Sequence, residues 1–407
     1  MGALLDGIYA VGFASHGVGP IAGVILGQFG ADVIKIESPV GGDPTRGYNR
    51  PGPKVPPGNH GISFEFTNRN TKSMTIDLNK EKGREIAYKL IGKSDVFFSN
   101  YLPYSLKRIG LDYETLSQYN PKLVYTASSA YGKEGPDNNK RAFDPLVLAR
   151  SGLMLASGEA DGPPIDIRGT IADTLAGTFL AFSVIAGLLA RERVGVGQEI
   201  STSLFAAMIW LQQANVQQFL YSGQGIERQS RMGALNPIAN NYKCKDGRWI
   251  KVSSGTSDDP RRDWHDFCRL LDIESIEKDP RFDNAIKRQD NSEELIKILD
   301  KAFLSKTCHE WQEHFKTQNA GFLYEAIQQV SELVDDPQVL ANNYIVEEDH
   351  PNLGHIKRLP FPMDFGKTPI VPAPKPAPQL GEHTDEIMLK IGYSMEEITE
   401  MRKNRII

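Results

Sequence analysis

Residues 8–37 follow a strand–loop–helix–strand pattern, which restricts the folds open to this chain. Residues 8–13 are a short apolar run of the kind that forms a buried strand, and residues 32–37, with β-branched Val33, Ile34 and Ile36, have the pattern of a second strand. Between them, a loop of small residues (15–19) leads into residues 20–29, whose apolar side chains recur at helical spacing. Two successive strands joined through a helix run parallel in one sheet. The pattern therefore predicts the first βαβ unit of an α/β fold.

The same alternation continues along the first third of the chain. Further strand patterns lie at residues 72–78, 95–99 and 123–128. They are reached through helical segments such as 82–91, and after Asp173 the pattern changes to long helices at 174–193 and 200–221. These runs predict a large Rossmann-like domain with a mostly parallel sheet and helical crossovers.

A smaller domain is expected to interrupt the large one. The polar, glycine-rich segment 222–237 has linker composition, and residues 241–252 predict a hairpin that turns at Asp246-Gly247. Helical patterns follow at 261–271, 293–304 and 308–317, and at 385–391 and 395–403 after a proline-rich linker at 368–378. We therefore expect a large α/β domain assembled from residues 1–224 and 330–407, with a small α+β domain at 225–329.

Charge and cysteine content exclude several classes of protein. The 407 residues carry 46 basic and 51 acidic side chains, a formal net charge of −5, so the positive footprint of a nucleic-acid-binding protein is missing. An anionic ligand would need locally placed cations, for which the candidates near strand ends are Arg46, Arg69, Lys72, Arg108 and Arg141. The three cysteines and eight histidines lack the spacing of a disulfide framework or a metal site, so no metal is predicted.

One segment raises the question of a membrane. Residues 174–190 carry no charge, and seventeen residues is close to the minimum for crossing a bilayer. Gly177 and Gly187 interrupt its apolar character and no second segment accompanies it, so we expect the buried core helix of a large domain. Residues 1–8 lack the pattern of a signal peptide. We expect a cytoplasmic protein that binds no membrane.

A glycine motif follows the first predicted strand. Residues 17–22, Gly-Val-Gly-Pro-Ile-Ala, match G-x-G-x-x-A, and Glu37 closes the next strand where a dinucleotide-binding fold holds the ribose. Pro20, however, removes an amide from the helix start, where a pyrophosphate needs hydrogen-bond donors. The motif leaves an NAD-dependent oxidoreductase open as an alternative, and Pro20 weakens that interpretation.

Asp173 precedes the long apolar helix and has two interpretations. Aspartate is a favourable N-cap. A carboxylate at a helix N-terminus is also held ionised and in one direction, as a nucleophile in a dry pocket requires. The residues alone leave both interpretations open.

Short motifs occur in a fixed order along nearly the whole chain: residues 5–8, 30–37, 42–44, 68–70, 143–145, 173–177, 195–198 and 380–385. Together they resemble the class III CoA-transferase family, which includes formyl-CoA transferase and carnitine CoA-transferase. The resemblance implies that CoA moves from an acyl-CoA donor to a carboxylic acid acceptor. Asp173 matches the family's nucleophile, which forms an aspartyl acyl anhydride and then an aspartyl-CoA thioester. The family also implies an interlocked homodimer, and a hetero-oligomer with a related subunit is the alternative.

Individual positions match the family's coenzyme A contacts: Gly17, Val18, Leu78, Asn100, Tyr101, Arg108, Arg141, Ala142 and Phe143, with His16 and Asp144 beside the substrate. The two arginines are the expected phosphate partners. Gly17 stands where formyl-CoA transferase has glutamine and Ser38 where it has arginine, which indicates an acceptor bulkier than oxalate. The α-methylacyl-CoA racemases have histidine at the position of Phe143, and a racemase of that type is the second alternative activity.

Overall fold

The computed structural model of the chain describes residues 2–47, 61–225, 227–254, 260–368 and 375–407. Most of the predicted linker at 368–378 lies outside these ranges. The chain divides into two compact units. The first contains Met1–Met154, Asp166–Gly225 and Tyr344–Ile407, and the second contains Leu155–Ile165 and Ile226–Asn343.

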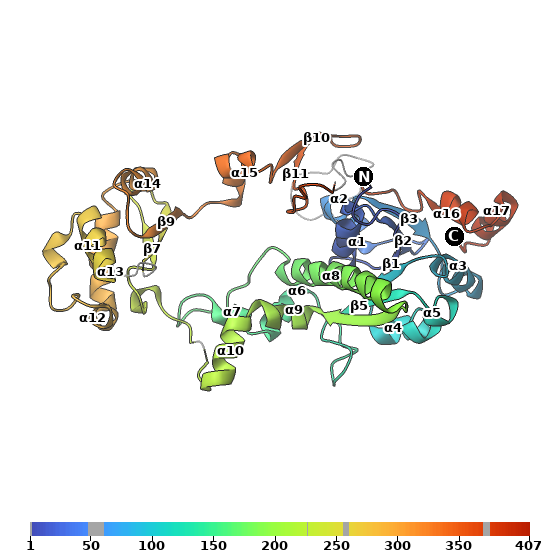
Figure 1. Ribbon diagram of the computed structural model, residues 1–407, viewed down its shortest axis with the longest axis horizontal. Coiled ribbons are helices and arrows are strands. Elements are labelled where there is room, and N and C mark those ends of the chain that lie inside the picture. The colour runs from blue at the N-terminus through green and yellow to red at the C-terminus, as the bar shows by residue number, and fades with distance from the viewer. Residues whose placement is uncertain (1, 48–60, 226, 255–259, 369–374) are drawn as a thin grey trace. The chain divides into compact units, whose positions relative to one another are not determined.

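Six parallel strands form the sheet of the first unit (Figure 1). They are β1 (Tyr9–Phe13), β2 (Asp32–Glu37), β3 (Thr71–Thr75), β4 (Val96–Ser99), β5 (Val124–Ser129) and β6 (Gln198–Ser203). Their order is β3-β2-β1-β4-β5-β6, and every pairing is parallel. The predicted α/β class and parallel sheet are therefore confirmed. The strand order reverses between β1 and β4. The loops that follow these two strands run in opposite directions, and the crevice between them is where sheets of this kind bind ligands.

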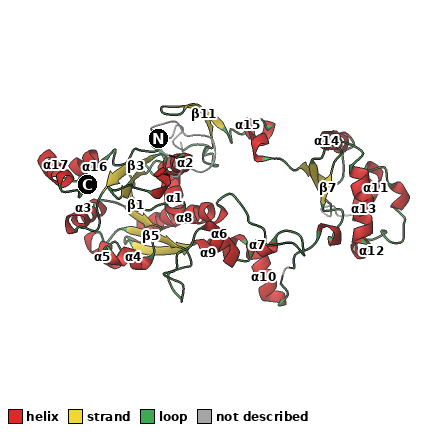
Figure 2. Cartoon of the chain, turned by 180° about the vertical axis from the view of Figure 1, so that it is seen from behind, coloured by secondary structure: helices red, strands yellow, loops and turns green. Residues whose placement is uncertain are grey.

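Helices cover both faces of this sheet (Figure 2). One face packs against α1 (Val18–Gln28), α6 (Asp144–Arg150), α8 (Ile171–Val194) and α9 (Leu204–Leu211). The other packs against α3 (Glu81–Ile91), α4 (Pro103–Arg108), α5 (Tyr113–Tyr119), α16 (Thr384–Lys390) and α17 (Met395–Lys403). Successive strand side chains alternate between the two cores, Ala10 in the first and Val11 in the second. The C-terminal helices thus return to the sheet that the N-terminus begins.

The long apolar helix α8 supports the first face. Its buried side chains Ala176, Leu180 and Val184 belong to the core of that face. Gly177 lets α1 come close, because an added Cβ would lie 2.9 Å from the carbonyl oxygen of Val18. Among the described helices, α8 is the one whose length and composition would suffice to cross a membrane, and the core helices of large domains share both properties.

The helix predicted at 200–221 is wrong at its start. Gln198–Ser203 instead forms β6, which pairs with β5 at the edge of the sheet. Ser203 ends the strand and begins α9, because its side chain accepts a hydrogen bond from the N–H of Ala206. The helix is then interrupted at Gln212, after which α10 (Gln213–Ser222) begins.

The second unit has its own core. It contains an antiparallel sheet of β7 (Asn241–Lys243), β8 (Trp249–Ser253) and β9 (Leu323–Ala326), with α11 (Pro260–Leu270), α12 (Ala285–Asp290), α13 (Ser292–Phe303), α14 (Cys308–Thr317) and α15 (Pro337–Ala341). The predicted β7–β8 hairpin is present, and the three cysteines are buried and free. The remaining described α-helices and strands are α2 (Ile62–Asn68), α7 (Leu153–Ala156), and the hairpin of β10 (Val346–His350) and β11 (Gly354–Arg358).

Candidate active site

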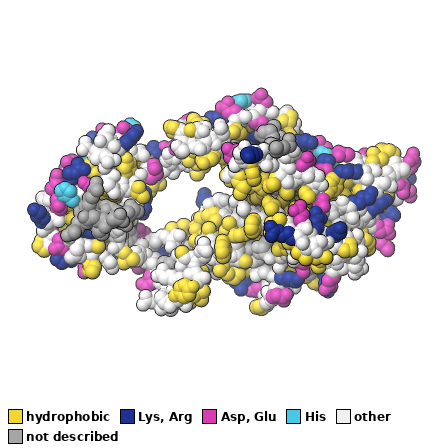
Figure 3. All heavy atoms as spheres, viewed as in Figure 1, with side chains coloured by type: hydrophobic (Ala, Val, Ile, Leu, Met, Phe, Trp, Pro, Cys, Tyr) yellow, Lys and Arg dark blue, Asp and Glu magenta, His cyan; other side chains and the backbone are white. Residues whose placement is uncertain are grey.

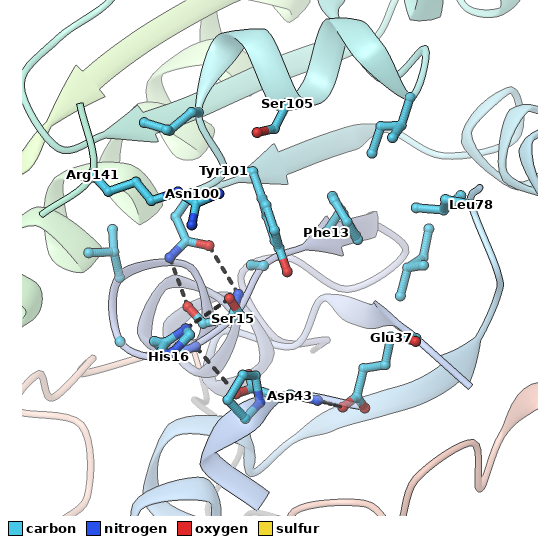
Figure 4. Close-up of a pocket in the computed structure, with 18 of the residues that line it drawn as sticks. Phe13, Ser15, His16, Glu37, Asp43, Leu78, Asn100, Tyr101, Ser105 and Arg141 are labelled. Atoms are coloured by element: carbon cyan, nitrogen blue, oxygen red, sulfur yellow. Dashed lines mark hydrogen bonds between the residues drawn. The ribbon is translucent and has the colours of Figure 1, made fainter. Parts of the chain in front are cut away.

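One side chain joins the two loops at the switch point of the sheet, those after β1 and β4. The amide oxygen of Asn100 accepts a hydrogen bond from the N–H of Ser15 (3.0 Å), and its amide nitrogen donates to the Ser15 carbonyl oxygen (2.8 Å) (Figure 4). Gly19, in the first turn of α1, lets the loop after β1 pack closely on the helix, because an added Cβ would lie 2.3 Å from the Cβ of Ala14. The loop after β1 therefore has a fixed shape.

His16 makes the turn from this loop into α1. Its backbone is left-handed, with φ of 65°, which is uncommon outside glycine. Its N–H donates to Oδ1 of Asp43 at 3.4 Å, and Asp43 is itself buried in an ion pair with Lys35. The turn brings Gly17 against Asp173, since a Cβ added at Gly17 would lie 2.4 Å from Oδ2 of Asp173.

Asp173 is the third residue of α8 and not its N-cap. Thr170 occupies the cap position, and its hydroxyl donates to the carbonyl oxygen of Gly169. The N–H of Asp173 donates instead to Oδ2 of Asp144 at 3.0 Å. The capping interpretation of Asp173 is therefore wrong, and Asp144, from another helix, supplies the acceptor that the helix start needs.

The Asp173 carboxyl group is partly withdrawn from water. Burial raises its pKa to about 6, and the neighbouring charge of Asp144 adds to the rise. A carboxylate of this kind is weakly hydrated, yet mostly ionised slightly above neutral pH. Both properties favour a nucleophile.

A cavity of about 590 Å³ opens at the carboxyl edge of the sheet (Figure 4). Of the predicted site residues, it is lined by His16, Gly17, Val18, Leu78, Asn100, Tyr101, Arg108, Arg141, Ala142, Phe143 and Asp173. These residues come from separate segments of the sequence, and the fold brings them to one place. Asp144 is the predicted residue that does not line this cavity.

Sequence reasoning missed part of the lining. The ring of Phe13 stacks on Tyr101 with 4.3 Å between ring centres, and the two together form one wall (Figure 4). Asn79 and Ser105 add polar groups. Asn79 follows a strand and Ser105 lies on a helix at the same edge of the sheet. Many residues with no role in a site have such positions, so the sequence does not single these two out.

Two of the five candidate cations line the cavity, Arg108 and Arg141. The other three are engaged elsewhere: Arg46 pairs with Glu37, Lys72 pairs with Asp32, and Arg69 donates to the carbonyl oxygen of Phe66. Within the described ranges, neither Arg108 nor Arg141 forms an ion pair. Their charges are therefore available to an anionic ligand.

A second cavity, of about 550 Å³, shares part of its wall with the first. His16, Gly17, Phe143 and Asp173 line both cavities, and Asp144 lines the second. Asp173 therefore stands where the two cavities meet. Among the residues that the structure describes, no group of three or more His, Cys, Asp or Glu side chains is placed to hold a metal ion.

Comparison with known proteins identifies the chain's relatives. The sequence model of CoA-transferase family III matches residues 5–384. The chain belongs to this family. An acyl-CoA transferase of Fusarium pseudograminearum is 32% identical over 99% of this chain and 88% of its own length. The (R)-2-hydroxy-4-methylpentanoate CoA-transferase of Clostridioides difficile is 29% identical over 99% of both chains. The crystal structure of a CAIB/BAIF family protein from Brucella suis has a TM-score of 0.83 and 28% identity, and it covers 96% of this chain and 100% of its own.

As a family III CoA-transferase, the protein is an enzyme that acts on acyl-CoA and carboxylate substrates. This assignment replaces the alternative of an NAD-dependent oxidoreductase. The contacts of Glu37 give a physical reason why this residue does not bind a ribose. Its buried carboxylate accepts hydrogen bonds from the Arg46 guanidinium (2.6 Å), the Ser73 hydroxyl (2.6 Å) and the Asp43 N–H (2.9 Å). These donors occupy the oxygens that a ribose would need.

Proposed function

We propose that this enzyme moves CoA between carboxylic acids with Asp173 as its nucleophile. The observation that supports this most strongly is the position of the Asp173 carboxylate at the junction of two cavities, with a pKa of about 6. One cavity is lined by the positions that match the family's CoA contacts, and the other leaves room for the acid. The thioester would lie between them, at the carboxylate.

The proposed reaction begins when an Asp173 oxygen attacks the thioester carbonyl carbon of acyl-CoA. The C–S bond breaks, and the thiolate leaves behind a mixed anhydride. The thiolate then attacks the Asp173 carbonyl carbon, the donor acid departs as a carboxylate, and an aspartyl-CoA thioester remains. The acceptor carboxylate repeats these two steps in reverse order, which releases acceptor-CoA and restores Asp173. No water, nucleotide or net proton is consumed, because each intermediate is activated to a similar degree.

Each addition creates an oxyanion that needs hydrogen-bond donors. The first bond within α1 runs from the N–H of Ile21 to the carbonyl oxygen of Gly17 (2.9 Å), and Pro20 has no N–H. In the described part of the chain, the N–H groups of Val18 and Gly19 have no acceptor. They lie at the positive end of the helix, directly after Gly17, where an added Cβ would lie 2.4 Å from Oδ2 of Asp173, and they are the proposed oxyanion donors.

The first cavity is the proposed CoA site. Arg108 and Arg141 offer charges for the phosphates, which a chain with net charge −5 must supply locally. The Phe13–Tyr101 stack offers an aromatic surface for the adenine ring. These roles agree with the positions matched by the family resemblance.

Exposed large apolar side chains on α8, α9 and α10 support the predicted homodimer. Phe182 on α8 is 64% exposed, Trp210 on α9 is 60% exposed and Tyr221 on α10 is 86% exposed. Figure 3 shows hydrophobic side chains gathered over the region of α8 and α9. A monomer rarely leaves so many large apolar side chains in water. We expect sedimentation velocity to give twice the monomer mass, and a monomer at micromolar concentration would contradict this part of the proposal.

The nucleophile is tested by trapping. The full-length enzyme is incubated with an acyl-CoA and quenched with hydroxylamine, and the modified peptide is mapped by mass spectrometry. A hydroxamate at Asp173 is the expected result. Asp173→Asn should lose both the hydroxamate and the transfer activity, whereas Glu192→Gln, an exposed carboxylate at the other end of the same helix, should keep both. Wild-type activity in Asp173→Asn would overturn the proposal.

A further inference from the structure

The second cavity has a lining that CoA does not explain. Although it shares Asp173 with the first cavity, in the described chain it lacks Tyr101 and both cations of the CoA side. Its apolar lining residues are Ile21, Phe66, Phe143, Pro145 and Ile167. All its lining residues belong to the first unit. A cavity of this size and character suits an acid with a chain of several carbons.

Arg168 is the one Lys or Arg side chain among the described residues that line this cavity. It is exposed, and within the described ranges it forms no ion pair or hydrogen bond. Three acidic residues, Asp144, Asp166 and Asp173, also line the cavity, and in the described ranges none of them forms an ion pair with Arg168. Asp144 accepts the hydrogen bond from the Asp173 N–H, and Asp166 is exposed to water. Arg168 therefore adds an unpaired guanidinium to a cavity lined by both apolar and polar side chains.

The backbone before α8 has an unusual conformation that places Arg168 there. Gly169 and Thr170 both have positive φ, 115° and 53°. A β-branched residue rarely adopts this conformation, and it persists only where the surroundings fix it. The two residues turn the chain so that Arg168 and Asp173, five positions apart, line one cavity. Strain of this kind is concentrated at functional sites.

We propose that Arg168 binds a second carboxylate on the acid whose CoA ester forms at Asp173. The guanidinium accepts no proton from the acid and holds a carboxylate through two parallel N–H···O bonds. The enzyme then prefers a dicarboxylic acid to a monocarboxylic acid of equal length. This inference rests on the proposed function, because it assigns the acid-side cavity of the same reaction.

The test compares three acceptors of similar length with one acyl-CoA donor: glutarate, pentanoate and 4-aminobutyrate. Wild-type enzyme is expected to use glutarate with a kcat/KM at least about tenfold above that for pentanoate. Pentanoate has a methyl group in place of the second carboxylate, so it cannot form the charged hydrogen bonds to Arg168. Arg168→Gln should lower the glutarate-to-pentanoate ratio by about tenfold, and Arg168→Lys should fall between. Arg193→Gln, an exposed arginine at the far end of α8, is the matched control and should leave the ratio unchanged.

A second readout needs no turnover. Glutarate binding to Asp173→Asn, measured by calorimetry, should weaken by about tenfold when Arg168→Gln is added. If every acid and variant fails to form acyl-CoA and no aspartyl adduct is trapped, the proposed function has failed. If transfer proceeds but the glutarate-to-pentanoate ratio does not depend on Arg168, this inference alone is wrong. Preferred use of 4-aminobutyrate that is lost in Asp166→Asn would also overturn it, because the cavity would then select a cation.

Discussion

The N–H of Asp173 donates a 3.0 Å hydrogen bond to Oδ2 of Asp144, so one carboxylate holds the backbone of the residue that bears the other. Asp144 begins α6 and is only 8% exposed, while Asp173 lies in the first turn of α8. The contact stabilises the start of α8, where a negative charge is favourable. It also places a like charge beside the Asp173 carboxyl group, which adds to the rise in its pKa.

Asp144→Asn should separate these two effects. The amide oxygen still accepts the hydrogen bond from the Asp173 N–H, but the negative charge is gone. The pKa of Asp173 is then expected to fall from about 6, by only part of its rise because burial is the larger cause. The acid limb of kcat/KM for acyl-CoA should move to lower pH. Asp144→Ala, which also loses the hydrogen-bond acceptor, is the comparison variant. If the acid limb does not move in Asp144→Asn, the charge of Asp144 does not influence the nucleophile.

Asp173→Asn should trade activity for stability. The folded-state pKa of about 6 lies above the unfolded value of roughly 3.9. Well below pH 4 both states are protonated and the group has no effect on stability. Between about pH 4 and pH 6 the carboxyl group is ionised in the unfolded state but still protonated in the folded state, so stability falls with pH, and the loss is complete above pH 6. The asparagine variant should therefore exceed the wild type in unfolding free energy by about 1–3 kcal/mol at pH 8, with little difference at pH 4.

Urea unfolding of both proteins at the two pH values measures this difference. Transfer activity should fall at the same time by roughly a thousandfold or more, because the nucleophile is missing. A wild-type enzyme that is the more stable of the two at pH 8 would mean that the Asp173 carboxylate is not strained by burial.

The sheet could be predicted largely from sequence, and its last strand could not. Most residues of β1 to β5 are buried, and β1, β2 and β4 contain the apolar residues that mark a buried strand. β6 contains Gln198, Glu199 and Ser201, lies at the edge of the sheet, and leads directly into an apolar helix. Ile200, which approaches Gly187 of α8, is the single apolar residue of β6, so no hydrophobic alternation is visible and the helical pattern that follows dominated the prediction.

The site shows a similar limit. Asp173 could be selected as a candidate, but its two interpretations could not be separated, because the group that replaces a local cap is Asp144, 29 positions away. Long-range hydrogen bonds leave no local pattern. Arg168 was not selected at all, since one exposed arginine in a loop resembles any other. The positive φ of Gly169 and Thr170, which places Arg168 in the cavity, is visible only in the structure.

Gly17→Ala tests how closely the first loop approaches the nucleophile. The added Cβ would lie 2.4 Å from Oδ2 of Asp173, so either the carboxylate or the loop must shift. Gly17 has φ of −102°, which alanine adopts without strain. We expect kcat to fall by roughly a hundredfold, as for other small displacements of reacting groups, while the melting temperature changes little.

Gly233→Ala is the matched control for this substitution, because its added Cβ meets no atom within 4 Å. It should leave both kcat and the melting temperature unchanged. If Gly17→Ala retains wild-type kcat, the carboxylate moves freely enough that its observed position is not required for the reaction.

Arg108 and Arg141 should act mainly on the binding of acyl-CoA. Each is exposed and lines the first cavity, so each charge is partly screened by water. Replacing either by glutamine is expected to raise KM for acyl-CoA about three- to tenfold and to change kcat less, since a phosphate far from the thioester is bound equally in ground and transition states. Raising the salt concentration should increase KM in the wild type and increase it less in the double variant.

Lys107→Gln removes a neighbouring charge on α4 that does not line this cavity, and it should leave KM unchanged. An equal effect of Lys107→Gln would show that the enzyme attracts CoA through its general surface charge and not through these two arginines.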